Sequence, residues 1–158
     1  MPSLQSNTVY FYRLPIDKNI APFDTYQDLA RTALEALDFS LPDSGPVLLK
    51  PNATVLYPAD QRIITHPGFL AGMLDALLAK GVERERLVVA EGQSGENPQA
   101  GYTWEKCGYA SMLRDYQVPL QSLNDVKTRS VDVPDGVVYQ QYNIATEVTD
   151  CALFINVP

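Results

Sequence analysis

Four short polar segments carry the side chains of this sequence that are best suited to chemistry. Each segment either ends a predicted strand or opens a predicted helix. The segments are Lys50-Pro51-Asn52, Thr65-His66-Pro67, Glu91-Gly92-Gln93-Ser94-Gly95 and Asn156-Val157-Pro158. Because ligands of open parallel sheets bind beyond the carboxyl ends of the strands, the sequence predicts that these segments meet at one sheet edge. The predicted ligand is a small anionic or polar molecule.

Three of these residues are predicted to hold the ligand. Lys50 is expected to meet an anionic group, with the amide of Asn52 beside it, and Asn156 adds a further amide. An ammonium group at the end of an apolar strand costs free energy unless it is paired or close to solvent. The alternative role of Lys50 is therefore structural, as a salt bridge to Glu91 at the rim of the sheet.

The loop that begins at Glu91 is predicted to complete the ligand site. Backbone N–H groups of Gly92, Ser94 and Gly95 can cradle an anion, and the Glu91 carboxylate can bind a hydroxyl group or act as a base. The loop lacks the Gly-Lys-Ser/Thr ending of a P-loop, and G-x-G-x-x-G follows none of the predicted strands. A flexible connection without a ligand is the alternative interpretation.

His66, the only histidine, is the second candidate for proton transfer. The dipole of the helix that follows it favours the neutral imidazole, which suits a base, a hydrogen-bond donor or a metal ligand. The alternative is that His66 only caps that helix. Because no H-x-x-H or H-E-x-x-H pattern is present, no metal site is predicted, and no cofactor is identified.

Composition narrows the class of protein. The 158 residues fit one domain, and the net charge of −7 disfavours nucleic-acid binding. The two cysteines lie outside any C-x-x-C pattern, which fits a reducing compartment. The first residues do not form a signal peptide, and no run approaches the roughly 20 apolar residues of a membrane helix. The sequence therefore predicts a cytoplasmic protein that does not span a membrane, and it leaves the oligomeric state open.

Apolar patterns predict a strand–helix–strand unit in the middle of the chain. The two strands are residues 47–49 and 87–90, which are short apolar runs typical of buried parallel strands. The helix between them opens with Pro67, after an N-cap at Thr65 or His66, and ends before Gly81. Two parallel strands joined by a helix form a βαβ unit.

The other elements follow from the same periodicities. An amphipathic helix is expected over residues 26–37, with Asp24 or Thr25 as its cap. Strands are expected at 8–14, 118–123 and 152–155, an extended segment at 137–142, and short helical pieces at 103–107, 110–116 and 143–148. This alternation predicts an α/β fold, a three-layer Rossmann-like domain with a mainly parallel sheet.

The ordered set of polar segments resembles the motifs of a family known as domain of unknown function 362. In that family Lys-Pro-Asn ends a strand, Thr-His-Pro opens a helix, and an acidic residue precedes a Gly-Ser loop; this sequence has Glu91 where Asp is expected. Gly108-Tyr109 and Ile155-Asn156-Val157-Pro158 are similar to further motifs. The resemblance implies that residues 1–158 form a single α/β domain, the N-terminal part of a longer family chain. A natural C-terminal strand is the alternative.

The resemblance also limits what can be assigned to these residues. The family pattern continues with a Lys-rich, His-containing stretch, and some members add a ferredoxin-like cluster domain with several cysteines. With Cys107 and Cys151 alone, no iron–sulfur role is assigned here. A looser similarity, in the order of strands, loops and glycines, links the sequence to the N-terminal domain of lactate racemase-like proteins. Those proteins bind a nickel pincer nucleotide, and the residues that would confirm this cofactor are not evident.

Two hypotheses about function follow. The first is a small-molecule enzyme, or half of one, in which Lys50, Asn52 and the loop at Gly92–Gly95 hold the ligand and His66 or Glu91 handles protons. The second is a non-catalytic binding or redox-partner module, in which the same motifs shape a docking surface.

Overall fold

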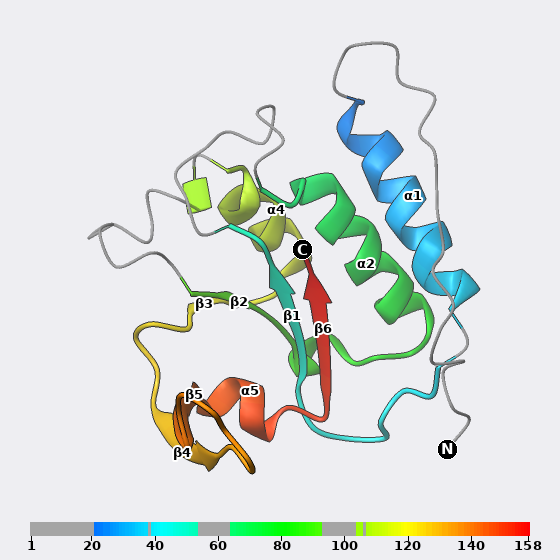
Figure 1. The fold of residues 1–158 in the computed structure, drawn as a ribbon. Coiled ribbons are helices and arrows are strands. Elements are labelled where there is room, and N and C mark those ends of the chain that lie inside the picture. Colours follow the sequence, from blue (N-terminus) through cyan, green and yellow to red (C-terminus); the bar gives the residue numbers. More distant parts are fainter. Residues whose placement is uncertain (1–20, 38, 54–63, 93–103, 106) are drawn as a thin grey trace.

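The computed structural model describes residues 21–37, 39–53, 64–92, 104–105 and 107–158 (Figure 1). The strand predicted at 8–14 and most of the loop between Asn52 and Ile64 lie outside these residues, so neither prediction is tested. All statements about the structure below refer to the described residues.

A parallel sheet forms the centre of the described part of the chain. Its four strands lie in the order β3-β2-β1-β6, and each neighbouring pair is parallel. The strands are β1 (Val47–Pro51), β2 (Leu87–Glu91), β3 (Leu120–Ser122) and β6 (Leu153–Val157). The predictions of strands at 47–49, 87–90, 118–123 and 152–155 are therefore confirmed in kind, with bounds that differ by one to two residues.

Helices pack against this sheet and bury its apolar side chains. The helices are α1 (Phe23–Ala36), α2 (Pro67–Ala79), a 3-10 turn η2 (Arg84–Arg86) and α4 (Tyr109–Tyr116). Val47, Leu49, Leu87 and Val89 are fully buried in one core with the apolar side of α2. In Figure 1, α1 and α2 run side by side next to the sheet. The fold is a three-layer, Rossmann-like α/β domain, as the sequence predicts.

The start and end of α2 follow the signals in its sequence. His66 is the N-cap, and its Nδ1 accepts a hydrogen bond from the Gly68 backbone N–H at 3.1 Å. Pro67 has no N–H and is tolerated in the first turn, where the N–H groups have no partner within the helix. Gly81 follows the C-cap with a φ of 89°, a conformation that glycine adopts without strain. The predicted bounds of this helix are confirmed.

The start of α1 differs from the prediction. The helix begins at Phe23, and its N-cap is Pro22, which makes no side-chain cap hydrogen bond. Asp24 and Thr25 lie inside the first turn, so the prediction that one of them is the cap is wrong. The ring of Phe23 lies 6.1 Å from the ring of His66, and this tertiary contact accompanies the earlier start. Asp24 instead places a negative charge near the positive end of the helix dipole.

An antiparallel ribbon is the main feature that the sequence analysis missed. Strands β4 (Thr128–Asp132) and β5 (Gln141–Ala145) pair with each other and lead into the short helix α5 (Thr146–Asp150). The extended segment predicted at 137–142 covers mostly the connecting loop, and the helical turn predicted at 143–148 begins inside β5. The predictions are wrong here because most of the ribbon is exposed and lacks the apolar alternation of a half-buried strand.

Residue 72 tests the packing of α1 against α2. A methyl group at Gly72 would overlap the carbonyl oxygen of Gln27 and lie 2.9 Å from Cβ of Ala30. We predict that Gly72→Ala lowers the free energy of unfolding by about 1–3 kcal/mol, as overpacking of a core does. Urea denaturation measures this change. The control Glu35→Ala, on an exposed position of α1, should change it by less than about 0.5 kcal/mol, and equal effects of both variants would contradict the packing described.

Candidate functional site

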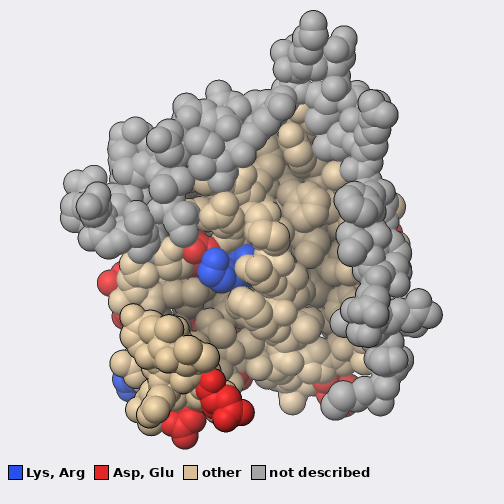
Figure 2. Space-filling view, in the orientation of Figure 1, with Lys and Arg blue, Asp and Glu red and all other residues tan. Residues whose placement is uncertain are grey.

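An ion pair joins the carboxyl ends of two neighbouring strands. Nζ of Lys50, near the end of β1, lies 2.6 Å from Oε2 of Glu91, the last residue of β2. The Glu91 side chain is 1% exposed, whereas that of Lys50 is 30% exposed. On the face that Figure 2 turns to the viewer, most of the described surface is uncharged, and a small group of basic and acidic atoms lies together near its centre. The salt bridge that the sequence analysis held as an alternative is therefore present.

The surroundings of Glu91 favour its neutral form. Burial raises the pKa of the Glu91 carboxyl above its ordinary value, because a charged group is poorly solvated there. The hydrogen bond and the charge of Lys50 act in the opposite direction, as does a hydrogen bond from the backbone of Gly92, and burial outweighs them. A carboxyl group with a raised pKa is suited to accept and return a proton closer to neutral pH.

The hydroxyl group of Thr65 connects the entrance of α2 to the ends of β1 and β6. It donates a hydrogen bond to the Val157 carbonyl at 2.6 Å and accepts one from the Asn52 backbone N–H at 2.9 Å. The Thr65 N–H in turn donates to the Asn52 carbonyl at 2.9 Å. The end of β1, the end of β6 and the entrance to α2 are thus held in one arrangement.

Tyr109, the first residue of α4, also holds Thr65 in place. Its hydroxyl group donates a hydrogen bond to the carbonyl of Thr65, and its side chain is fully buried at the start of α4. Burial raises the pKa of Tyr109 far above its ordinary value, and electrostatic interactions with Cys107 and Glu91 act in the same direction. Tyr109 therefore stays protonated and remains a hydrogen-bond donor.

The sheet register brings other predicted ligand-binding residues to this edge. Asn156 is the register partner of Lys50 and is exposed. Gly92 follows Glu91 directly, and a Cβ atom there would lie 3.1 Å from the side-chain oxygen of Asn124. Asn52 is held in place by its backbone hydrogen bonds to Thr65 and Val157. Ser94 and Gly95 lie outside the described residues.

The ring of His66 packs against helix α1, and its Nδ1 caps helix α2. Its ring is stacked on that of Tyr26, with centroids 4.1 Å apart and planes at 19°, and Nδ1 accepts the hydrogen bond that caps α2. Burial lowers the pKa of His66, which favours the neutral ring that this cap requires. These are the contacts of a helix cap, and the role of His66 in proton transfer stays a prediction.

Sequence reasoning missed two contributors to this edge. Thr65 was predicted to lie in one of the four polar segments and to be a possible cap, and Tyr109 was noted only as part of a family motif, since nothing in their local sequence shows that their hydrogen bonds reach distant backbone. The residues at the end of β3 were also passed over, although the strand-end rule selects them. Ser122 is the register partner of Glu91, and the Leu123 N–H donates to the Glu91 carbonyl at 3.0 Å.

The described part of the chain has neither a cluster of metal-ligating side chains nor a helix that could cross a membrane. Among these residues, no group of three or more His, Cys, Asp or Glu side chains is placed so that it could hold a metal ion. None of the helices that the structure describes has the length and apolar character needed to cross a membrane.

Comparison with known families identifies the group to which the chain belongs. The family model described as "Domain of unknown function (DUF362)" matches residues 47–158, from the first residue of β1 to the last residue of the chain. The chain is a member of the DUF362 family. Comparisons with curated proteins and with solved structures gave no match. The part that matches DUF362 contains the ion pair, Thr65 and Tyr109, while helix α1 precedes it.

The Thr65 hydroxyl offers a direct test of how this DUF362 sheet edge is held. We predict that Thr65→Val lowers the free energy of unfolding by about 0.5–1.5 kcal/mol, because the hydrogen bonds of the hydroxyl group to Asn52 and Val157 are lost while the direct bond from the Asn52 N–H to the Val157 carbonyl remains. Thr65→Ser keeps the hydroxyl group and should lose clearly less. Equal losses in the two variants, measured by urea denaturation, would show that the hydroxyl does not hold the edge.

The raised pKa of Glu91 predicts a dependence of stability on pH. Between the ordinary value of 4.5 and the higher pKa of the folded protein, the folded state binds the proton more tightly than the unfolded state. The contribution of Glu91 is therefore complete below the ordinary value and is lost as the pH rises through the pKa of the folded protein. We expect Glu91→Gln to remove this part of the decline in the free energy of unfolding, measured by urea denaturation at a series of pH values.

Two further variants sharpen the pH experiment. Lys50→Met removes the partner that opposes the effect of burial, so the decline should become larger and extend to higher pH. Glu85→Gln, an exposed change of the same kind, should leave the wild-type profile unchanged. A Glu91→Gln profile that matches the wild type would refute the assignment.

Proposed function

We propose that this DUF362 chain binds a small anion that carries a hydroxyl group, at the carboxyl ends of β1 and β2. The observation that carries the proposal is the Lys50–Glu91 pair, in which a buried carboxylate meets a partly exposed ammonium group. Lys50 would hold the anionic group of the ligand, and Glu91 would bind the hydroxyl group. In an enzyme, Glu91 would also accept the hydroxyl proton and return it.

The energetics of the pair support a role beyond stability. Removing two charges from water costs several kcal/mol per ion, and a buried ion pair often contributes no more than apolar residues of similar volume. Glu91 ends an otherwise apolar strand, LVVAE, so an apolar residue in its place would extend the core. Ionisable groups with perturbed pKa values cluster at functional sites, and this supports the proposal.

The chemistry of the two groups suggests the class of ligand. The Lys50 ammonium carries three N–H donors, and its 30% exposure makes it accessible to a ligand from solvent. One of these donors binds Glu91, and the others can bind a carboxylate or phosphate of the ligand while Glu91 stays charged. A hydroxyl group next to that anion would then lie within reach of Glu91. Hydroxy acids and sugar phosphates have this arrangement.

Neighbouring groups complete the proposed site. The exposed amide of Asn156 lies beside Lys50 in the sheet register and can bind further polar groups of the ligand. Thr65 and Tyr109 would not touch the ligand but would position the strand ends through the hydrogen bonds described above. In this proposal Glu91 carries the proton, and His66 holds the entrance of α2.

Ligand binding tests the proposal. We predict that a 2-hydroxy acid or a sugar phosphate raises the Tm of the chain, by an amount that corresponds to about 2.7 kcal/mol when the ligand is present at 100 times its Kd. Lys50→Met should weaken binding by about tenfold or more, since it removes a charged partner of the anion. The matched control Lys127→Met changes the net charge equally at an exposed position in front of β4 and should bind as the wild type does.

The outcomes separate binding from chemistry. Binding that is lost in Lys50→Met and kept in Lys127→Met supports the site, and a Glu91→Gln variant that still binds but no longer exchanges a substrate proton supports catalysis. The proposal fails if no hydroxyl-bearing anion shifts the Tm, or if Lys50→Met binds as tightly as the wild type.

A second candidate function is favoured by a separate observation. Several large apolar side chains at the tip of the β4–β5 ribbon are exposed, which is a feature of protein-binding surfaces rather than of a small-molecule site. This agrees with the alternative of a binding module.

A further inference from the structure

The tip of the β4–β5 ribbon exposes an unusual amount of apolar surface. Val137 is 99% exposed, Val138 79%, Tyr139 59% and Tyr142 49%. The rings of Tyr139 and Tyr142 lie 5.3 Å apart at an angle of 58° and form one aromatic cluster. We refer to Val137, Val138, Tyr139 and Tyr142 as the apolar tip. Single exposed apolar residues are common on protein surfaces, but a contiguous group marks an interaction site.

Contacts at its base close the β4–β5 ribbon and join it to helix α5. Arg129 forms an ion pair with Asp150 of α5 at 2.5 Å and donates a second hydrogen bond to Thr149. Thr146 donates to the Lys127 carbonyl through both its N–H, at 2.9 Å, and its hydroxyl group. A two-stranded ribbon alone is at best marginally stable in water. These contacts fix its base and reduce the entropy that the ribbon would lose on binding a partner.

The loop that carries the apolar tip is also ordered by its own hydrogen bonds. Its ends are joined by the Val133 N–H, which donates to the Gln140 carbonyl at 2.8 Å, and the Gly136 N–H donates to the Val133 carbonyl at 3.1 Å. Asp135 has a φ of 59°, so the turn between these residues matches the Pro-Asp-Gly signal of a tight turn. A side chain at Gly136 would overlap the carbonyl of Tyr139. These hydrogen bonds close the loop that carries Val137, Val138 and Tyr139.

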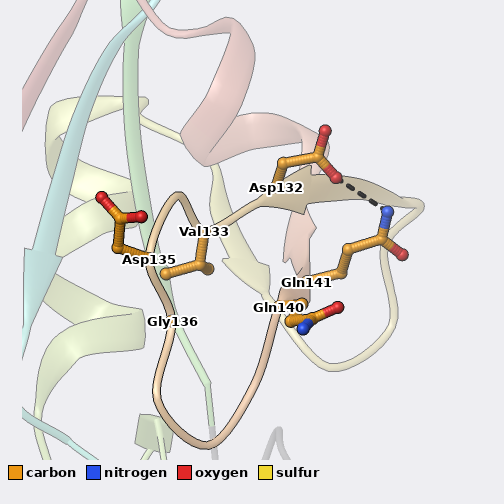
Figure 3. A pocket seen from close by; sticks show the side chains of 6 residues that line it. All are labelled: Asp132, Val133, Asp135, Gly136, Gln140 and Gln141. Carbon is orange, nitrogen blue, oxygen red and sulfur yellow. Dashed lines mark hydrogen bonds between the residues drawn. The ribbon is translucent and has the colours of Figure 1, made fainter.

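Acidic and amide groups border the apolar tip. A hollow of about 780 Å³ within the loop is lined by Asp132, Val133, Asp135, Gly136, Gln140 and Gln141 (Figure 3). Asp132 accepts a hydrogen bond from Gln141 at 2.7 Å, while the carboxylate of Asp135 makes no hydrogen bond or ion pair with the residues that the structure describes. Because the whole chain has a net charge of −7, a nucleic acid or an anionic membrane would be repelled here.

We propose that the β4–β5 ribbon docks onto a partner protein that presents an apolar groove bordered by Lys or Arg. The apolar tip would fill the groove, and Asp135 with Asp132 would receive the basic side chains. Aromatic residues that carry a polar group, such as Tyr139 and Tyr142, are typical anchors of protein interfaces. In Figure 1 the ribbon lies at the opposite end of the strands from the proposed ligand site. A partner bound there would leave the Lys50–Glu91 pair accessible.

Selection of peptides on the folded chain tests this proposal. Short random peptides are displayed, selected on the wild type, synthesised, and measured for Kd by fluorescence anisotropy. The proposal expects sequences that combine apolar residues with Lys or Arg, and binding that weakens as salt is added. Tyr139→Ser combined with Tyr142→Ser should raise the Kd about tenfold or more, as should Asp135→Asn, since aromatic hot-spot residues and their charged neighbours dominate such interfaces.

Controls make the outcome decisive. Asp115→Asn, which removes the same charge from an exposed position on α4, should leave the Kd unchanged. All substituted residues are exposed, so the variants should keep the wild-type Tm. Selected peptides that are acidic or neutral, that bind the tip variants undiminished, or that are not obtained at all would overturn the proposal. So would self-association of the chain, measured by light scattering, that the tip variants abolish, because the occupant would then be a second copy.

Discussion

The hydroxyl group of Thr65 connects segments that are far apart in the sequence, and the shape of the sheet edge depends on it. One side chain donates to the last residue of β6, accepts from the residue after β1, and begins the turn that enters α2. Its carbonyl is held by Tyr109 from α4. Backbone groups buried at the end of a strand need partners, since each unpaired group costs about 1–3 kcal/mol. The Asn52 N–H also donates to the Val157 carbonyl at 3.1 Å, so the Thr65 hydroxyl group adds to a direct backbone bond between the ends of β1 and β6.

Among the described residues, Glu91 carries the most deeply buried carboxyl group. With the strand ends fixed, its carboxylate is almost completely buried and has Lys50 as its charged partner. Burial and the partner act on its pKa in opposite directions, and burial prevails. In the proposed function, an anion that binds Lys50 would weaken the interaction that opposes the effect of burial, so the pKa of Glu91 would rise further. The exposed β4–β5 ribbon, whose base is closed by contacts with α5, lies at the other end of the strands (Figure 1).

Much of the fold could be predicted from local sequence, whereas the site could be predicted only in part. The run Val47–Leu49, the cap at His66, Pro67 and Gly81 are local signals, and the structure confirms the βαβ unit that they predict. The Lys50–Glu91 pair could be foreseen because both residues end adjacent apolar strands. The hydrogen bond from Thr65 to Val157 could not, since it spans 92 residues and depends on strand order. Strand β4 was missed because its side chains are exposed and show no apolar face. Asp24 was wrongly predicted as a cap because the helix begins earlier, at Phe23, whose ring lies near that of His66, and local sequence does not reveal such a tertiary contact.

The most direct test of the central claim is to measure the pKa of Glu91 itself. The side-chain carboxyl carbon of Glu91 can be followed by NMR as the pH is changed, first in the free protein and then with inorganic phosphate as a simple anion. If the pair is the ligand site, the pKa lies above the ordinary value of 4.5 in the free protein, and it rises further when phosphate takes up the charge of Lys50. A pKa at or below the ordinary value that phosphate does not change would contradict the account, because Glu91 would then be a fixed structural charge.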